Sequence, residues 1–326
     1  MSRPEDDALR PSPASPAPSD EGGGSAAEGE DFRAGFVALI GLPNVGKSTL
    51  LNELVGGKLS IVTSRPQTTR RRVTGILTDE SHQAIFLDTP GLMEPRYALH
   101  RAMRDEAGRA AADADVLVRV VDAGFEPSVE QAEAEGPDPD RPSLACLNKV
   151  DRVRGEEADR LERRLSGAGW TRVVRTVATT PEGVDDLRAS ILGSLPASPP
   201  LYPPGDLSVE PVRFFVEELI RETCFEVLEE EVPYGTAVRV TEFREDDEPL
   251  YIAAELLVER DSQKGIVIGR GGSMIRRIGT ASRRKVEAFV GRRVYLDLRV
   301  KVLPRWTRKT DKLARLGYRL PGAGPG

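Results

Sequence analysis

The sequence is poor in cysteine, histidine and aromatic residues. Its 326 residues include two cysteines and two histidines, and 5% are Phe, Trp or Tyr. Cys146 and Cys224 each stand in an apolar run, which favours small core residues over a disulfide or a metal site. His82 and His100 lack the spacing of metal ligands, so no zinc site is expected.

Long apolar runs are missing as well. No segment has the roughly 20 apolar residues that a membrane-spanning helix needs. The N-terminus lacks the basic stretch followed by an apolar stretch that marks a secretory signal. Together with the low cysteine content, this leads us to expect a protein of the reducing cytoplasm.

Charged residues are unevenly placed along the chain. The net charge of −6, taken alone, argues against a nucleic-acid partner. Residues 1–32, however, hold eight acidic residues and two arginines, and they have almost nothing apolar to bury, which predicts a disordered acidic tail. Residues 260–319 hold eighteen Lys and Arg against four Asp and Glu, which predicts a surface that attracts polyanions.

Short apolar runs alternate with helical patterns between residues 33 and 195. The predicted strands are Phe36–Ile40, Ala84–Leu87, Val116–Val121, Leu144–Leu147 and Arg172–Val177, and the predicted helices are Ser48–Leu54, Leu99–Ala112 and Glu156–Ala168. This alternation is typical of an α/β domain, in which helices cover both faces of a mostly parallel sheet. Two features fit less well. Arg119 stands inside a strand that should be buried, and Ser128–Gly136, mostly Glu and Ala, predicts a short, frayed helix.

A proline-rich stretch separates this domain from a second one. Five prolines within Leu195–Asp206 predict a semi-rigid linker over residues 196–210. Residues 211–306 then predict a small α+β domain, followed by a tail at 307–326. Its predicted helices are Val212–Leu228 and Met274–Val290, and its predicted strands are Thr236–Phe243, Leu250–Glu259 and Val294–Val302.

The first chemical motif is a glycine-rich loop between a predicted strand and a predicted helix. It reads Gly41-Leu42-Pro43-Asn44-Val45-Gly46-Lys47-Ser48. Its backbone N–H groups and the helix N-terminus suit phosphate oxygens. We expect Lys47 to reach the β- and γ-phosphates and the Ser48 hydroxyl to bind Mg²⁺.

Two more motifs follow the ends of predicted strands. Asp88-Thr89-Pro90-Gly91 predicts a carboxylate that holds Mg²⁺, usually through water, and a glycine N–H that meets the γ-phosphate. Asn148-Lys149-Val150-Asp151 predicts the base site, because an aspartate accepts from guanine N1–H and its N2 amino group together. Adenine lacks those donors. Each motif alone is also ordinary turn chemistry, and their order and spacing favour the nucleotide interpretation.

A nucleotide switch also needs a mobile threonine that closes on Mg²⁺ and the γ-phosphate. Between the first two motifs lies Gln67-Thr68-Thr69-Arg70-Arg71-Arg72, where we choose Thr69 over Thr68. A basic, solvated loop is the alternative. The predicted catalytic set is therefore Lys47, Thr69 and Gly91, and the predicted Mg²⁺ ligands are Ser48, Thr69 and Asp88.

The second domain carries Gly-x-x-Gly at Gly269-Arg270-Gly271-Gly272, between two helical segments, which gives an α-β-β-α-α-β order. In KH domains this loop clamps about four nucleotides of single-stranded RNA through its backbone. The glycines permit close approach, and Arg270, Arg276 and Arg277 supply positive charge beside it. A small α/β domain whose arginines only keep it in solution is the alternative.

Together, the phosphate loop and the segments Gln67–Arg72, Asp88–Leu92 and Asn148–Asp151 resemble the GTPases related to translation factors, and the Era family in particular. Glu230–Tyr234 and Gln263–Gly269 are similar to the KH domain of that family. The resemblance runs from about Gly35 to about Trp306. It implies a P-loop GTPase domain followed by a KH-type domain.

The family resemblance implies more than the motifs do. It implies hydrolysis of GTP to GDP with Mg²⁺, and a K⁺ ion held partly by Asn44. Leu92 stands where signalling GTPases carry a water-orienting glutamine, which implies slow intrinsic hydrolysis. The Ala178 backbone N–H would meet guanine O6, although Val177 replaces the serine of the family motif.

The resemblance also implies partners. It points to the 3′ end of small-subunit ribosomal RNA and to a role in maturing the RNA and assembling the 30S-type subunit. It further implies peripheral association with the cytoplasmic face of the inner membrane. Two other hypotheses stay open at this point: a guanine-nucleotide binder with negligible turnover, and a membrane-associated switch without RNA. Lipid binding would not require Gly269–Gly272.

Overall fold

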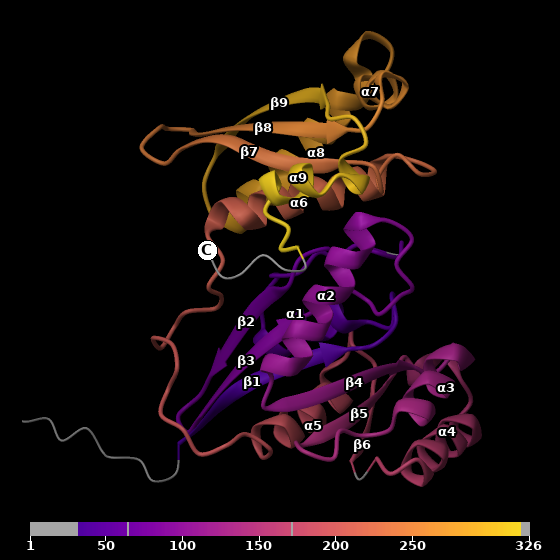
Figure 1. Cartoon of the computed structure of the whole chain (residues 1–326). Helices are drawn as coiled ribbons and strands as arrows, with labels where there is room; N and C mark the ends of the chain where they lie inside the picture. The colour runs from indigo at the N-terminus through magenta and orange to yellow at the C-terminus, as the bar shows by residue number, and fades with distance from the viewer. Residues whose placement is uncertain (1–31, 64, 171, 321–326) are drawn as a thin grey trace, which may run out of the picture. The chain divides into compact units, whose positions relative to one another are not determined.

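The computed structural model describes residues 32–63, 65–170 and 172–320 (Figure 1). The predicted acidic tail at 1–32 lies, apart from Phe32, outside the described residues. No helix in the described part of the chain has the length and apolar character needed to cross a bilayer.

The first half of the described chain forms a six-stranded sheet of order β2-β3-β1-β4-β5-β6. Its strands are β1 (Arg33–Ile40), β2 (Val73–Thr78), β3 (His82–Asp88), β4 (Val116–Asp122), β5 (Ser143–Asn148) and β6 (Val173–Thr176). Only β2 runs antiparallel to its neighbour, and the other pairs of neighbouring strands are parallel. The prediction of a mostly parallel sheet is confirmed.

Helices cover both faces of this sheet (Figure 1). They are α1 (Lys47–Val55), α2 (Ala98–Asp113), α3 (Glu126–Glu135), α4 (Gly155–Gly167) and α5 (Pro181–Leu192). Helices α1 and α5 pack on one face through leucine and valine side chains, while α2, α3 and α4 pack on the other. Because the strands are buried on both sides, they read as continuous apolar runs in the sequence.

The sequence patterns missed β2 and α5 and underestimated α3. Strand β2 carries Gly75 and two threonines, so it lacks an apolar run and is recognised only by its pairing with β3. The expectation of a frayed helix at Ser128–Gly136 was wrong, since α3 is a regular helix of 10 residues. Its Glu and Ala residues favour helix, and Val129 and Ala132, three positions apart, are both fully buried against the sheet.

Arg119 is accommodated in the buried strand β4 by an ion pair. Its side chain is 6% exposed and its Nη2 atom pairs with the Glu135 carboxylate at the end of α3. Burial lowers the pKa of Arg119 to about 10. The Nε and Nη1 atoms have no hydrogen-bond partner among the described residues, so this charge is only partly compensated.

The second half of the described chain forms a three-stranded sheet of order β7-β8-β9. Its elements are α6 (Val212–Val227), β7 (Ala237–Arg244), β8 (Leu250–Val258), α7 (Asp261–Ile268), α8 (Ser273–Val290) and β9 (Val294–Val302). Strand β8 pairs antiparallel with β7 and parallel with β9, and one face of the sheet packs against α6 and α8. The order α-β-β-α-α-β predicted from the sequence is confirmed.

The segment 196–210, predicted to be a linker, follows the outer edge of the first sheet. Its Leu207 carbonyl accepts a hydrogen bond of 2.9 Å from the Ile76 N–H of β2. The Leu201 and Tyr202 N–H groups donate to Gln83 Oε1 at 2.7 and 2.9 Å. Strand β2 therefore gains a backbone partner on its second side, and the segment is also anchored to β3.

Residues 307–320, predicted to begin a tail, fold back onto both halves of the chain. After a 3₁₀ turn (Trp306–Arg308), helix α9 (Thr310–Arg315) buries Leu313 completely, and the Tyr318 ring stacks on Trp306 at 6.2 Å. Their cluster includes Leu99 and Met103 of α2. The apolar residues that pack here are widely spaced in the sequence, so they form no local pattern that would have predicted the helix.

Candidate functional site

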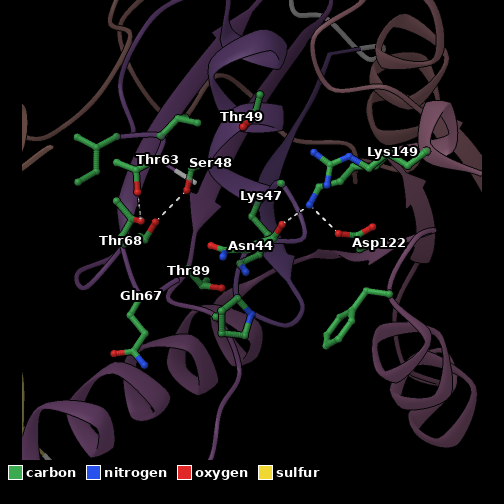
Figure 2. A pocket seen from close by; sticks show the side chains of 18 residues that line it. Asn44, Lys47, Ser48, Thr49, Thr63, Gln67, Thr68, Thr89, Asp122 and Lys149 are labelled. Atoms are coloured by element: carbon green, nitrogen blue, oxygen red, sulfur yellow. Dashed lines mark hydrogen bonds and ion pairs between the residues drawn. The ribbon is translucent and has the colours of Figure 1, made fainter. Parts of the chain in front are cut away.

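A cavity of about 640 Å³ lies where the phosphate loop, residues 61–63 and 67–69, and the start of the β3–α2 loop come together (Figure 2). The phosphate loop connects β1 to α1 and curls through Gly46, whose φ is 108°. A Cβ atom there would lie 2.2 Å from the Asn148 amide nitrogen, so only glycine fits. Asn44 lines the same cavity and has a φ of 64°.

Lys47 lies beneath this loop. Its Nζ atom donates to the Gly41 and Leu42 carbonyls at 3.1 and 2.9 Å, and the residue is 6% exposed. Burial lowers its pKa to about 8, against the opposing effect of the Asp88 carboxylate. An anion placed in the cavity would favour the charged form of Lys47 and draw it off these carbonyls.

Three oxygen-bearing side chains from separate segments converge beside Lys47. Ser48 Oγ lies 2.8 Å from Thr69 Oγ1 and donates to Asp88 Oδ2 at 2.7 Å. Thr69 Oγ1 lies 3.5 Å from the same carboxylate oxygen. Hydroxyl and carboxylate oxygens are the ligands that Mg²⁺ prefers, so this cluster has the chemistry of a magnesium site.

Asp88 is fully buried, and its second carboxylate oxygen, Oδ1, has no hydrogen-bond partner among the described residues. Burial raises the pKa of Asp88, although hydrogen bonds from Ser48 and Ser60 and the nearby Lys47 charge oppose that shift. A buried carboxylate oxygen without a hydrogen-bond donor is suited to be the ligand of a cation. Ser60, which donates to Asp88 Oδ2 at 2.9 Å, was missed by sequence analysis because it belongs to no recognisable motif.

The two candidate threonines have different environments. Thr69 contacts Ser48, whereas Thr68 Oγ1 donates to the Arg65 carbonyl at 2.8 Å and lies 3.0 Å from Thr63 Oγ1 (Figure 2). Thr68 is thus used to shape its own loop. Of the pair, Thr69 is the one beside the predicted magnesium ligands.

The Asp88–Leu92 segment packs directly on the phosphate loop. Thr89 Oγ1 donates to the Leu39 carbonyl at 2.8 Å, and the Leu92 N–H donates to the Gly41 carbonyl at 3.0 Å. Pro90 and Gly91 are buried between these anchors. A Cβ atom at Gly91 would lie 2.5 Å from the Pro43 nitrogen, so the segment can approach this closely only with glycine.

The opposite end of the cavity is built by the β5–α4 loop. Asn148 Nδ2 donates to the Val45 carbonyl at 2.8 Å, and its Oδ1 accepts from Thr176 Oγ1 and the Ala178 N–H at 3.0 and 3.1 Å. Asn148 thereby ties three loops together. The Ala178 N–H, predicted to meet the base, is engaged by Asn148 in this structure.

Lys149 extends along the wall of the cavity (Figure 2). Its Nζ atom bonds the Asn44 carbonyl and lies 2.6 Å from Asp122 Oδ2. Val150 and Asp151 follow in a 3₁₀ turn, where Asp151 is exposed. Sequence analysis missed Asp122, although its place at the end of β4, like that of Asp88 at the end of β3, was a usable signal.

The second candidate site is the loop between α7 and α8. Gly269, Gly271 and Gly272 have φ values of 73°, 56° and 75°, and a Cβ atom at Gly271 would meet no atom of the described residues within 4 Å. The outer side of this loop is therefore open to close approach. Arg276 Nη2 donates to the Gly271 carbonyl at 2.6 Å, while Arg270 and Arg277 are exposed.

Comparisons with known proteins agree for both halves. The family model of the 50S ribosome-binding GTPase matches residues 36–149, and that of the KH domain matches residues 231–307. GTPase Era of Mycobacterium sp. (strain KMS) is 41% identical over 303 residues, which cover 88% of this chain and 99% of the relative. GTPase Era of Deinococcus deserti is 40% identical over 298 residues, 89% of this chain and 97% of the relative.

The chain belongs to the Era family of GTPases. A crystal structure of an Aquifex aeolicus Era variant bound to GDP and AlF₄⁻ superposes with a TM-score of 0.83 at 35% identity, covering 89% of this chain and all of that one. A second Era structure contains MgGDPNP and nucleotides 1506–1542 of 16S ribosomal RNA, and has the same TM-score and coverage at 36% identity. The Era family therefore accounts for both the GTPase fold and the KH domain.

Proposed function

We propose that this GTPase holds GTP and Mg²⁺ in the 640 Å³ cavity, with Ser48, Thr69 and Asp88 disposed around the ion. The observation that carries this is the convergence of those three side chains next to the unpartnered Asp88 Oδ1. Mg²⁺ would neutralise charge on the β- and γ-phosphates. Residues 33–195 and 211–306 are proposed as the two domains.

The phosphate contacts follow from the loop geometry. Lys47 leaves the Gly41 and Leu42 carbonyls and donates to the β- and γ-phosphates, while the loop N–H groups and the start of α1 face the other oxygens. Gly91 donates its N–H to the γ-phosphate. Leu92 supplies no group that could orient the attacking water, so turnover by the chain alone is slow.

Guanine selection is assigned to Asp151, whose carboxylate accepts from N1–H and the N2 amino group. A base that lacks both donors leaves this carboxylate unpaired, which supports a discrimination of about 10⁴–10⁵. Ala178 would release Asn148 to meet guanine O6. Val177 cannot donate a side-chain hydrogen bond, so it holds the Ala178 loop less firmly than a serine at this position would. We expect this to lower the affinity for guanine nucleotide more than the selectivity for guanine over adenine.

K⁺ is proposed as a second cation, held in part by Asn44 at the cavity wall. Its role would be to add positive charge near the γ-phosphate. The proposal predicts faster turnover in KCl than in NaCl of equal concentration. Equal rates in the two salts would remove K⁺ from the site.

The KH domain is proposed to bind the 3′ end of small-subunit ribosomal RNA, in maturation of that RNA and assembly of the subunit. Support comes from the open glycine loop at Gly269–Gly272, from the exposed arginines beside it, and from the solved Era complex with nucleotides 1506–1542 of 16S ribosomal RNA. Phosphate contacts make such binding fall steeply with added salt.

The deciding experiment measures GTP turnover in K⁺ buffer with and without a short single-stranded RNA that copies the 3′ end of 16S ribosomal RNA. We expect stimulation by RNA that is lost in Lys47→Ala and, separately, in the double variant Gly271→Asp and Gly272→Asp. If the turnover rate is the same with and without RNA, and no RNA binding is detected, the proposed role of the KH domain is refuted. Undetectable phosphate release under all conditions would favour a nucleotide binder without turnover.

Peripheral membrane association is proposed through the basic face of the KH domain, because anionic lipid attracts exposed arginines. A matching measurement is flotation with vesicles that contain anionic lipid. Binding that survives the double glycine variant, while RNA binding is lost, would separate the two partners.

A further inference from the structure

Arg70 is a buried cation of the GTPase half of the chain whose hydrogen-bond acceptors lie in the KH half. The residue is 3% exposed, and its guanidinium donates to the backbone carbonyls of Pro233, Tyr234 and Thr236 at 3.1, 2.9 and 2.8 Å. These carbonyls belong to the turn between α6 and β7. Three bonds to fixed acceptors match the planar, five-donor fork of arginine and no other side chain.

Aromatic rings complete the socket around Arg70. Its guanidinium carbon lies 5.6 Å from the centre of the Phe225 ring and 5.7 Å from that of the Trp306 ring. Trp306 is itself fully buried, and its Nε1 donates to the Gly235 carbonyl in the same turn at 2.9 Å. Tyr318 stacks on Trp306, so the folded-back C-terminal segment closes the socket. Burial lowers the pKa of Arg70.

This arrangement holds only while the two halves are docked. A buried guanidinium is costly unless its donors are satisfied, so Arg70 must either fill the socket or return to water. Backbone carbonyls and aromatic faces satisfy it only in this one position. An undocked KH half would leave Arg70 hydrated and its loop free of this anchor.

Arg70 directly follows Thr69, the threonine beside the predicted magnesium ligands. Consecutive Cα atoms are about 3.8 Å apart, so a shift of the Arg70 backbone by more than a few ångströms would also carry Thr69 off Ser48. The same loop has an earlier anchor on α6. The Val62 N–H donates to Glu222 Oε1 at 3.1 Å, and Lys58 pairs with the same carboxylate at 2.8 Å.

We infer that Arg70 is a positioning residue that makes the inward placement of Thr69 depend on docking of the KH half through the α6–β7 turn. The inference rests on the proposed function, since it takes Thr69 to close on Mg²⁺ and the γ-phosphate. GTP, which favours inward Thr69, then favours the docked arrangement, and the docked arrangement favours GTP by the same factor. GDP lacks the γ-phosphate, so its affinity should depend little on the position of Thr69 or on docking of the KH half.

The test compares Arg70→Gln with the wild type in the full chain. We expect affinity for a non-hydrolysable GTP analogue to fall at least tenfold, while affinity for GDP changes less than twofold. The analogue affinity of Arg70→Lys should lie between those of the wild type and Arg70→Gln, because one ammonium nitrogen replaces the two nitrogens, Nη1 and Nη2, that share the three carbonyls. Arg72→Gln is the matched control in the same loop, since Arg72 pairs with Glu106 and Asp113 of α2 and, within the described residues, with no charged group of the KH half.

A second readout separates positioning from loss of fold. The wild type should bind the 16S-like RNA with an affinity that differs between the GTP analogue and GDP, and Arg70→Gln should bind it equally in both. Unchanged GDP affinity shows that the GTPase half is folded. The inference would be overturned if, without RNA, the ratio of analogue affinity to GDP affinity were the same in Arg70→Gln as in the wild type. If the wild type itself binds no RNA, the proposed function fails while the nucleotide ratio still tests Arg70.

Discussion

Replacing Gly91 by alanine should block closure of the Asp88–Leu92 segment on the phosphate loop. The added Cβ would lie 2.5 Å from the nitrogen, 2.6 Å from the Cα and 2.8 Å from the Cγ of Pro43. Favourable contacts between such atoms begin at about 3.5 Å. The overlap is about 1 Å, and since two of the three atoms are backbone, no rotamer change relieves it.

The cost of that overlap sets the expected magnitude. Overpacking of this kind costs typically about 1–3 kcal/mol, and 1.4 kcal/mol is about a tenfold change in an equilibrium constant. The segment should therefore move off the loop, weakening the analogue-bound state by about 10- to 100-fold and lowering turnover to match. GDP affinity should change little, because the phosphate loop and Asn148–Asp151 hold GDP without this segment.

The assay is equilibrium binding of fluorescent GDP and of a fluorescent non-hydrolysable GTP analogue, together with single-turnover hydrolysis. Gly108→Ala is the control, because a Cβ atom there meets no atom within 4 Å in the part of the chain that the structure describes, and alanine suits the interior of α2. Wild-type analogue affinity and turnover in Gly91→Ala would refute the idea that Gly91 must approach Pro43 for closure.

Three further predictions test other parts of the structure. Leu313→Ala should lower the free energy of unfolding in denaturant by about 2–5 kcal/mol, because Leu313 is fully buried; no change would mean that residues 307–320 are a free tail after all. Cys146 and Cys224 should react with a thiol reagent only after unfolding, since burial raises the pKa of each thiol to about 12; rapid labelling of native protein would contradict their burial. Burial, with Arg70 and Arg96 nearby, lowers the pKa of His100 in the folded chain. Just below pH 6.5 the unfolded chain therefore binds more protons than the folded chain. The melting temperature should fall as the pH drops from about 6.5. That dependence should weaken in His100→Gln, which can keep the hydrogen bond to Gln67, and an unaltered pH profile would show that His100 does not cause it.

The main elements and the nucleotide motifs were predictable because their signals are local. Strands buried on both faces need continuous apolar runs, and a loop that binds phosphate through its backbone needs glycine at set positions. Strand β9 was predicted with the bounds that the structure has, since apolar and polar residues alternate through it. Strand β2 was not, because its place depends on pairing with β3 and with the segment at 201–210.

Site details that need two distant segments escaped sequence analysis. Asp122 meets Lys149 because the sheet brings the ends of β4 and β5 together. Ser60 reaches Asp88 from the connection between α1 and β2. From the sequence alone, Trp306 is compatible with stacking on a base or with closing a core. Its bond to the Gly235 carbonyl and its burial show that it closes the core. The choice depended on where residues 307–320 pack.

By itself the sequence determined a GTPase motif set followed by a KH-type loop, because glycines, phosphate-binding residues and strand ends obey short-range rules. Only the tertiary structure decided that Arg70 is buried. In the sequence Arg70 is one of three consecutive arginines and is typical of a solvated loop. Its burial requires carbonyls more than 160 residues away, a tryptophan further on and a folded-back C-terminal segment, and no local pattern encodes contacts at that separation.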